Sequence, residues 1–414
     1  MGKRYDDHHR LLKEGEVQRK DGYYQYRWTD RWGKRHSLTA KTLSLLREKE
    51  NEILLDKLDG IRAESRNYTL DDLFNMWCKL KRGLQDNTFQ NYKYLYKSFV
   101  SPYIGSCILI NLHRSDIKKL YNQLLDEQNL KVNTLDSVHT VLRQVFQLAV
   151  EDNFIRQNLC DNLMKEIKQT RNEGRPNKRA LTLPEQELFL EYISRENNKY
   201  YHWYPIFVIM LGTGMRVGET VGLRWEDIDL DKGVISVKHT LVYYKHESGR
   251  CYFNVHPTKT KAGTREIPML DYVKEAFLLE KEMQKLTVIK CKAEIDGYSG
   301  FIFTNRFGDA LHQGILNKAL RRIIRDCNKE QLSKGEDDPV LLPDFSCHIL
   351  RHTAATRMLE AGLNVKVLQA VLGHADYQTT MDIYVDVTNE LKEREFKMIQ
   401  SKMNRNKRNE DSSE

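Results

Sequence analysis

The chain has 414 residues, of which 40% are hydrophobic and 30% are charged, and its formal net charge is +8. No apolar run approaches the ~20 residues needed to cross a bilayer, so we expect a globular protein without a membrane partner. The first residues, MGKRYDDHHRLLKEGE, lack the apolar core of a signal peptide, which favours the cytoplasm. The seven cysteines form no CxxC pair, and this favours reduced thiols over a disulfide framework or a zinc knuckle. The length predicts two to four domains.

Residues 1–60 predict a small domain made of three strands and a helix. KDGY, residues 20–23, is a hairpin-turn signal, YYQYRWT and RHSLT are strand-like, and the pattern becomes helical from Thr42 to Leu58. Aromatic residues alternate with basic ones, and a β-ribbon of this kind can enter a DNA major groove. A domain so small also needs aromatic residues for its core. We therefore expect core residues on one face of the sheet and DNA-binding residues on the opposite face. The residues assigned to DNA are Arg27, Arg31, Lys34 and Arg35.

Residues 69–165 predict a bundle of four to five helices, because apolar residues recur there at intervals of three and four. Thr69 and Ser115 are the expected N-cap residues of two of these helices. A basic cluster beside a turn favours DNA binding, although lysines also occur on ordinary solvated helix faces. This cluster consists of Lys79, Lys81 and Arg82.

Residues 166–180 are polar, rich in basic residues and without an apolar stripe, which predicts an exposed linker. A solvated linker with no ligand would have the same composition. A chain that wraps around a duplex would also be basic at such a point, and we therefore assign Arg175, Lys178 and Arg179 to DNA binding.

Residues 181–390 predict a mainly helical domain with a small antiparallel sheet. Thr182 and Glu185 form a capping box, and a very apolar helix ends near Gly212. Strands are expected in GVISVKHT, CYFNVHPT and TREIPM, and helices over residues 271–286, 313–327, 346–361, 364–371 and 377–385. Residues 391–414 begin as an amphipathic helix and end as a polar tail. The expected fold class is therefore multi-domain and mainly α, with α+β character in this last large domain.

The stretch CHILRHTAATRMLEAG, residues 347–362, fits two kinds of site. His348 and His352 are four residues apart, and Cys347 is adjacent, which is a spacing that a helical zinc site would use. Arg351 argues against this reading, because a cation beside a metal ion is unfavourable. A histidine and an arginine on one helical face are also suited to binding a phosphate, and this stretch alone leaves both readings open.

Three further segments carry residues suited to phosphate chemistry. Arg216 follows a glycine turn at an expected helix start, where free backbone N–H groups also favour an anion, and its plain alternative is a surface pair with Glu219. Lys259 lies at a turn between two expected strands, with Lys261 close by, and either lysine could instead be an exposed hairpin tip. The third segment, LGHADYQTTMDIYVDV, contains His374 and Tyr384.

Together these segments resemble one family, the tyrosine recombinases or phage-type integrases. The resemblance rests on Arg216 within TGMRVGE, on His348 and Arg351 within HILR, on the LGH that ends at His374, and on Tyr384 ten residues later. The order and spacing match over residues 180–390. The N-terminal sheet resembles the arm-site DNA-binding domain of integrases from conjugative transposons, and the helical bundle resembles the core-binding domain of the family.

The resemblance implies a reaction at a phosphodiester without a metal or other cofactor. Tyr384 would be the nucleophile, forming a 3′-phosphotyrosine and freeing a 5′-hydroxyl, in two reversible displacements. Arg216 and Arg351 would neutralise the charge of the transition state. The remaining roles would fall to His348 as general base or phosphate ligand, His374 as a hydrogen-bond donor to the phosphate, Lys259 (or else Lys261) as general acid, and Glu219 as a support.

The resemblance also implies site-specific integration and excision of a mobile element of the conjugative-transposon kind. The partners would be double-stranded DNA at crossover and arm sites, further copies of the chain in a tetramer that passes through a Holliday junction and exchanges its C-terminal segments, and an excision factor. Such an enzyme would act in the bacterial cytoplasm, at the nucleoid. Two alternatives remain at this point: a nicking-closing topoisomerase that needs no partner site, and a DNA-binding regulator without catalysis.

Overall fold

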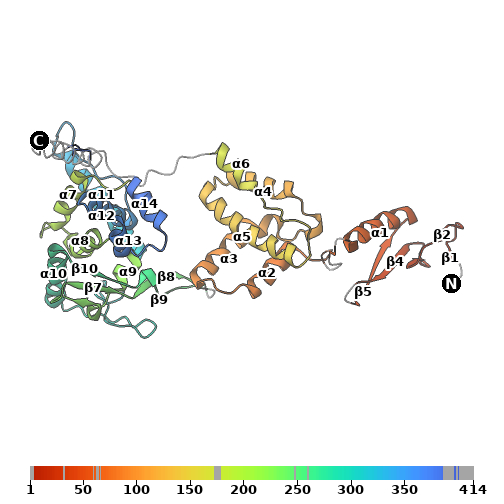
Figure 1. The fold of residues 1–414 in the computed structure, drawn as a ribbon, viewed down its shortest axis with the longest axis horizontal. Helices are drawn as coiled ribbons and strands as arrows, with labels where there is room; N and C mark the ends of the chain where they lie inside the picture. Colours follow the sequence, from red (N-terminus) through yellow and green to blue (C-terminus); the bar gives the residue numbers. More distant parts are fainter. Residues whose placement is uncertain are drawn as a thin grey trace, which may run out of the picture. The chain divides into compact units, whose positions relative to one another are not determined.

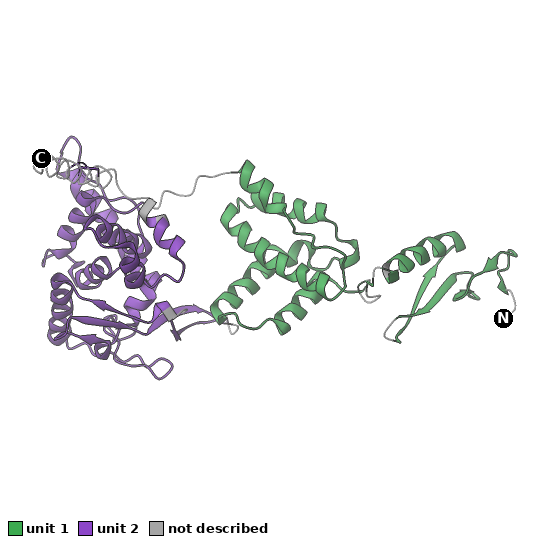
Figure 2. Ribbon diagram, in the orientation of Figure 1, with its two compact units in different colours: residues 1–175 green, residues 176–414 purple. Residues whose placement is uncertain are grey.

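The computed structural model describes residues 4–30, 33–58, 60–61, 65, 67–171, 179–246, 249–258, 261–385, 396–397 and 400. For residues 56, 261, 382, 384 and 385 it describes the backbone alone. The chain divides into two compact units, residues 1–175 and 176–414, each of which is described by itself (Figure 2). No helix in the described ranges is long and apolar enough to span a membrane.

The N-terminal part of the first unit is a three-stranded antiparallel sheet in the order β3-β4-β5, followed by a helix (Figure 1). Its elements are β3 (Glu16–Gln18), β4 (Tyr24–Thr29), β5 (Arg35–Ala40) and α1 (Leu43–Leu58). Side chains alternate along β4, so Tyr24 and Tyr26 face the small core while Arg27 is exposed. The expected sheet and helix are confirmed. The sequence pattern missed an additional two-residue ladder between β1 (Arg4–Tyr5) and β2 (Leu11–Leu12).

A pair of buried carboxyl groups lies between this sheet and α1. Arg47 on α1 donates from Nε to Glu16 Oε1 over 3.0 Å and from Nη2 to Glu16 Oε2 over 3.1 Å. Glu50, one turn further along α1, is also buried. Burial, followed by its hydrogen bond to Glu16, raises the pKa of Glu50 above its usual range. The pair therefore favours one ionised carboxylate, on Glu16, and one protonated acid, on Glu50.

Glu50→Gln should stabilise the sheet of the N-terminal domain at pH 8 and leave it unchanged at pH 4. Folding favours the protonated form of Glu50, so the wild type loses stability as the pH rises through the raised pKa, whereas an amide cannot ionise. We expect a gain on the order of 1 kcal/mol at pH 8, because the wild type must either keep Glu50 protonated above its ordinary pKa or ionise it in the interior, and the amide does neither. The measurement is hydrogen exchange of the β4 and β5 amides in the full chain, with the exposed Glu48→Gln as the matched control. Equal protection of the two variants at both pH values would contradict the expectation.

The second part of the first unit is a helical bundle over residues 69–171. Its helices are α2 (Leu70–Leu80), α3 (Asp86–Phe99), α4 (Arg114–Asp126), α5 (Val132–Glu151) and α6 (Leu163–Thr170), with a π-helical turn at Ser101–Gly105 and a 3₁₀ turn at Leu109–Asn111. Their apolar faces share one core, in which Phe74, Leu95, Val141, Val145 and Phe146 are buried. The bundle of helices is therefore confirmed.

Two details of this bundle differ from the sequence reading. Thr69 does cap α2, with its hydroxyl accepting from Asp72 N over 3.1 Å, but Ser115 caps nothing. The N-cap of α4 is His113, because the Asp116 carboxylate accepts from the His113 backbone N–H over 3.0 Å and starts the helix earlier. Helix α6 continues to Thr170, into the expected linker, because Ile167 is buried against the bundle.

The second unit packs around α8 (Tyr204–Thr213), whose side chains from Pro205 to Thr213 are all buried. Helices α7 (Leu183–Ser194), α10 (Asp271–Thr287) and α12 (Cys347–Glu360) contact it. One small antiparallel sheet has the order β10-β7-β6, and β8 pairs with β9 in a hairpin. These strands are β6 (Ile228–Asp229), β7 (Val234–Val237), β8 (His239–Lys245), β9 (Cys251–Pro257) and β10 (Arg265–Pro268).

The remaining helices of this unit are α9 (Val217–Gly222), α11 (Gln313–Ser333), α13 (Val365–Leu372) and α14 (Tyr377–Val385), with 3₁₀ turns at Tyr201–Trp203, Trp225–Asp227 and Lys261–Gly263. The expected helices are present, and α11 extends further than predicted. Strands β9 and β10 match the expected ones, but the single strand expected over GVISVKHT is divided between β7 and the start of β8, which belong to different sheets. Thr182 forms the expected capping box with Glu185 at the start of α7. The amphipathic helix expected from residue 391 lies almost entirely outside the described residues.

Candidate active site

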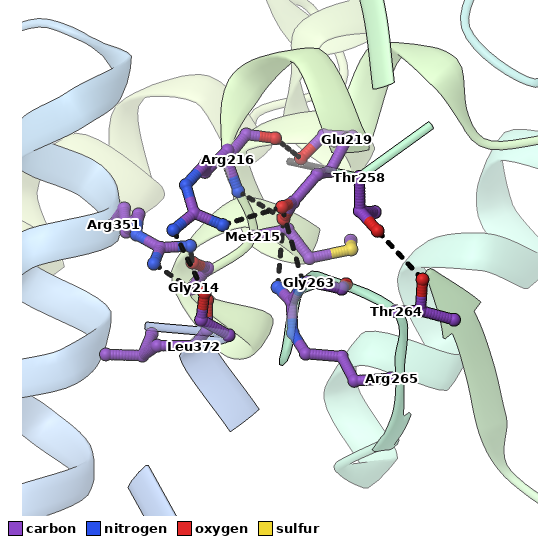
Figure 3. Close-up of polar contacts among 12 residues, drawn as sticks. Gly214, Met215, Arg216, Glu219, Thr258, Gly263, Thr264, Arg265, Arg351 and Leu372 are labelled. Atoms are coloured by element: carbon purple, nitrogen blue, oxygen red, sulfur yellow. Dashed lines mark hydrogen bonds and ion pairs between the residues drawn. The ribbon is translucent and has the colours of Figure 1, made fainter. Parts of the chain in front are cut away.

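Four charged side chains from three distant segments of the second unit meet at one point (Figure 3). Arg216 and Glu219 come from the start of α9, Arg265 from β10, and Arg351 from α12. Hydrogen bonds and ion pairs connect these segments to one another, as the following paragraphs describe. We call this group the arginine cluster: Arg216, Glu219, Arg265 and Arg351.

Glu219 is the central acceptor of the arginine cluster. Its carboxylate is buried and accepts from Arg216 Nη1 over 2.8 Å, from Arg216 N over 3.0 Å and from Arg265 Nη2 over 2.9 Å. Burial by itself would raise the pKa of Glu219, but the hydrogen bonds and charge of Arg265, together with Arg216, lower it below its usual range. Glu219 therefore stays ionised and orients two guanidinium groups at once.

Arg265 ties three parts of the site together. In addition to its ion pair with Glu219, its Nε donates to the carbonyl oxygen of Val371, and its Nη1 donates to the carbonyl of Gly263 over 3.0 Å. Val371 belongs to α13, which leads directly to His374, and Gly263 belongs to the loop that contains Lys259. The Arg265 side chain is itself buried, so these contacts are largely shielded from water.

Arg351 is held by the carboxyl-terminal ends of two helices. Its Nη1 donates to the Gly214 carbonyl and its Nη2 to the Leu372 carbonyl, both over 2.8 Å. Gly214 caps α8 at φ +63°, and Gly373 caps α13 at φ +65°, a left-handed conformation that glycine adopts without strain. The C-terminus of a helix carries a partial negative charge, which stabilises a cation without neutralising it. Arg351 is only 4% exposed, so the cluster keeps a buried positive charge.

The charge balance of the arginine cluster favours an anionic ligand. Three guanidinium groups surround one carboxylate. Burial, and then the repulsion of Arg216 and Arg265, lowers the pKa of Arg351 to about 9, so the group is still a cation at neutral pH. An anion such as a phosphate that approaches Arg351 would relieve this repulsion, which is the kind of preorganised charge that stabilises a phosphoryl transition state.

His374 adjoins the arginine cluster and is also buried. Its Nδ1 lies 3.0 Å from Oγ1 of Thr380 on α14. Burial, followed by the charges of Arg351, Arg216 and Arg265, lowers the pKa of His374 to about 4. The imidazole is therefore neutral at physiological pH, with one nitrogen that donates and one that accepts.

The other predicted catalytic residues are placed to different extents. His348 is exposed in the first turn of α12, three residues before Arg351. Tyr384 lies on α14, which packs against α12 and α13, but its side chain is outside the description. Lys259 falls outside the described residues, and Lys261 is described by its backbone in a 3₁₀ turn. The hydroxyls of Thr258 and Thr264, which flank both lysines in the sequence, are 2.8 Å apart and hydrogen-bonded (Figure 3).

The predicted DNA-binding residues are placed as follows. Arg27, Lys34 and Arg35 are exposed on the N-terminal sheet or next to it, and Lys79 and Arg82 are exposed at the end of α2. Lys81 lies over the ring of Trp77, with Nζ 5.5 Å from its centroid.

Four further assignments concern Arg31 of the N-terminal domain and three residues of the expected linker. Arg31, Arg175 and Lys178 lie outside the described residues. Arg179 donates to Glu185 over 2.7 Å and thereby stabilises the capping box of α7. Arg179 therefore has a structural role.

Sequence reasoning missed two residues of the site, Arg265 and Thr380. Arg265 carried a usable signal, because it lies two residues before the buried Ile267 on β10 and therefore on the same face of the strand. A cation on the apolar face of a strand needs a buried partner. Thr380 carried little signal, because a threonine in a helix usually needs no partner outside that helix. As for metals, no three His, Cys, Asp or Glu side chains in the described part of the chain are arranged to hold an ion.

Comparison with known proteins places these residues in a family. Residues 179–390 match the phage integrase family, residues 1–57 the DNA binding domain of Tn916 integrase, and residues 69–125 the N-terminal SAM-like domain of phage integrases. The chain belongs to the phage integrase family. It is a tyrosine recombinase, an enzyme that exchanges DNA strands.

Several relatives resemble this recombinase over nearly its whole length. The transposase from transposon Tn916 of Enterococcus faecalis is 28% identical over 402 residues, which cover 93% of this chain and 94% of that protein. The transposase from transposon Tn1545 of Streptococcus pneumoniae matches with the same identity and coverage. The integrase of transposon Tn1549, solved in complex with transposon right end DNA, has a TM-score of 0.68 and 27% identity, covering 80% of this chain and 100% of the solved chain.

Glu219→Gln should strongly destabilise the second unit of the recombinase. Removing one partner of a buried ion pair leaves uncompensated charge, here on the buried Arg265, and typically costs about 3–5 kcal/mol. The control is Glu226→Gln, whose carboxylate pairs with Arg224 but is 68% exposed, and which should cost about 1 kcal/mol or less. The free energy of unfolding is measured by urea titration, with hydrogen exchange of α8 and β10 peptides as the readout. Similar losses in both variants would show that Glu219 is not the central acceptor.

His374→Gln should flatten the pH dependence of stability in the acid range. The pKa of folded His374 is about 4 against an ordinary value of 6.5, so the folded state resists protonation. Stability is full above pH 6.5 and declines as the pH falls towards 4, by up to about 3 kcal/mol for this group. The measurement is the free energy of unfolding of both proteins at half-unit steps from pH 7 to 4. Parallel curves would mean that His374 does not stay neutral when buried.

Proposed function

We propose that this recombinase integrates and excises a mobile element of the conjugative-transposon kind by cutting and rejoining double-stranded DNA at its attachment sites. The observation that carries the proposal is the arginine cluster, with a buried cation held by neutral carbonyls next to a neutral histidine. The names of relatives support the choice of substrate: the Tn1549 integrase was solved in complex with transposon right end DNA and with circular intermediate DNA.

Tyr384 is the nucleophile of the proposed reaction. Its phenolic oxygen attacks the scissile phosphorus, forms a 3′-phosphotyrosine and releases the 5′-oxygen of the cut strand. His348 accepts the phenolic proton or holds the phosphate, and Lys259, with Lys261 as the alternative, donates a proton to the leaving 5′-oxygen. A second 5′-hydroxyl then reverses the step on a new strand. The phosphodiester energy is conserved in the intermediate, so the reaction needs no cofactor.

Arg216, Arg351 and His374 bind the non-bridging oxygens of the phosphate in this scheme. Planar guanidinium groups suit these oxygens, because two parallel N–H donors match two acceptors. The cluster is already ordered by Glu219 and by the helix ends, so little rearrangement is needed when charge develops in the transition state. Arg265 orients the arginine cluster through its ion pair with Glu219.

Binding of DNA in the proposed scheme is spread over three domains. The N-terminal domain, residues 1–60, binds arm sites through Arg27, Arg31, Lys34 and Arg35. The helical bundle, residues 69–165, binds the core site through Lys79, Lys81 and Arg82, and the basic segment 166–180 joins it to the catalytic domain, residues 181–390. Exposed cations suit this task, because contacts with phosphates supply most of the non-specific affinity for DNA.

The proposed assembly is a tetramer of the chain on two DNA sites. Its protomers exchange strands in pairs through a Holliday junction, and residues 391–414 of each protomer dock on a neighbour. The enzyme works in the bacterial cytoplasm on DNA of the nucleoid.

The test uses DNA that carries the ends of the element that encodes the protein, with a nick beside the cleavage site so that religation is blocked. In EDTA, the wild type should form a protein–DNA adduct that survives SDS, and Tyr384→Phe should form none while still binding in a mobility-shift assay. Tyr377→Phe is the matched control, because Tyr377 begins the same helix and is 47% exposed, and it should form the adduct at the wild-type rate.

Each contrary outcome points to a different alternative. An adduct that persists in Tyr384→Phe would mean that another residue is the nucleophile, and loss of the adduct in EDTA alone would require a metal. Binding by every protein with no adduct from any of them would favour a DNA-binding regulator. Relaxation of a supercoiled plasmid that lacks the element ends would favour a nicking-closing topoisomerase.

A further inference from the structure

Thr380 makes a side-chain contact that three other buried helical threonines do not make. The hydroxyls of Thr213, Thr220 and Thr356 each donate to the backbone carbonyl four residues earlier, over 2.6, 3.2 and 3.0 Å. The hydroxyl of Thr380 instead lies 3.0 Å from Nδ1 of His374, and this is its one hydrogen bond in the described part of the chain. Thr380 is completely buried, so water does not compete for the contact.

The backbone of His374 is fixed independently of Thr380. Its N–H donates to the Gln369 carbonyl over 3.2 Å, and its carbonyl accepts from the Gln369 side chain over 3.1 Å. The preceding Gly373 cannot be replaced without a clash, because a Cβ there would lie 2.9 Å from Arg265 Nη1. The backbone contacts leave the protonation of the ring free, so the hydroxyl of Thr380 is the described partner that can select a tautomer.

The tautomer decides what His374 offers to a phosphate. If Thr380 donates to Nδ1, then Nε2 carries the proton and can donate to a phosphate oxygen. If Nδ1 carries the proton and donates to Thr380, then Nε2 presents a lone pair, which repels that oxygen. The Thr380 hydroxyl does not donate to a backbone carbonyl of the described residues, so its O–H can rotate towards the His374 ring and donate to Nδ1.

We propose that Thr380 is a positioning residue for DNA cleavage, whose hydroxyl donates to Nδ1 of His374 and thereby holds Nε2–H as the donor to the scissile phosphate. This inference rests on the proposed roles of His374 and Tyr384. The same hydrogen bond links two parts of the site. Positions 380 and 384 are one turn apart on the same face of α14, so the bond attaches the helix of the nucleophile to the phosphate-binding residues.

The first arm of the test reads the tautomer directly. The full chain is labelled with ¹⁵N-histidine, and imidazole nitrogen spectra are recorded for the Tyr384→Phe protein bound to the nicked DNA, with His374→Gln to assign the signal. We expect His374 to be protonated at Nε2 in this protein and in its Thr380→Ser derivative, and to lose this single form in its Thr380→Val derivative. Protonation at Nδ1 with Thr380 intact would overturn the proposal, whether or not the Val variant folds.

The second arm measures adduct formation in a single turnover at saturating DNA. Thr380→Val is nearly isosteric and should slow the reaction on the order of 10- to 100-fold, as loss of a residue that orients a catalytic group typically does. Thr380→Ser keeps the hydroxyl and should remain within about threefold of wild type. Thr379→Val is the matched control, because Thr379 is the exposed neighbour on the same helix, and its rate should be unchanged. Affinity for DNA should be equal in all variants.

The outcomes separate this proposal from the proposed function. If Tyr384→Phe abolishes the adduct and His374→Gln slows it, but Thr380→Val cleaves at the wild-type rate, then the function stands and the role of Thr380 is wrong. If Thr380→Ser is as slow as Thr380→Val, the contact is one of packing rather than of hydrogen bonding, and the proposal is also wrong. An adduct that survives Tyr384→Phe would instead refute the proposed function itself.

Discussion

One buried carboxylate, that of Glu219, organises the positive charge on which the catalytic domain depends. Without it, the buried guanidinium groups of Arg265 and Arg351 would be like charges in a region of low dielectric, with the partly exposed Arg216 beside them, and their repulsion would be strong. Glu219 orders two of them, and the ends of α8 and α13 hold the third through carbonyl oxygens. The positive charge is therefore compensated in part, and it still exceeds the negative charge, as the proposed binding of a phosphate requires.

Much of this architecture could be predicted from the sequence. The periodicity of apolar residues located the helices of the bundle, and the spacing around Arg216, Arg351 and His374 indicated residues that the fold does bring together. Local sequence signals predicted helix ends less well. Ser115 is a residue type that often caps helices, but the N-cap of α4 is His113, whose backbone N–H donates to the Asp116 carboxylate. A short ladder such as β1–β2 has two residues in each strand, too few for any alternation to be recognised.

The supporting residues of the site were harder to predict, because their partners are distant in the sequence. Arg265 acts through Glu219, which lies 46 residues away, and through Val371, which lies 106 residues away. The pairing of Thr380 with His374 spans only six residues but crosses from a helix cap to the next helix. A motif records which groups a reaction needs, whereas these contacts depend on how α9, β10, α13 and α14 pack.

The burial of the arginine cluster has a consequence for the response to ionic strength. Salt screens charges that water reaches, over a distance of about 8 Å at physiological concentration, and screens buried charges far less. The exposed cations of the N-terminal sheet and of α2 are in the first situation, and Arg351, Arg265 and Glu219 are in the second. In the proposed scheme, added salt should therefore weaken the contacts of the exposed cations with DNA at a lower concentration than it weakens the contacts of the arginine cluster with a phosphate. Binding of DNA and the reaction at its phosphate would then respond differently to ionic strength.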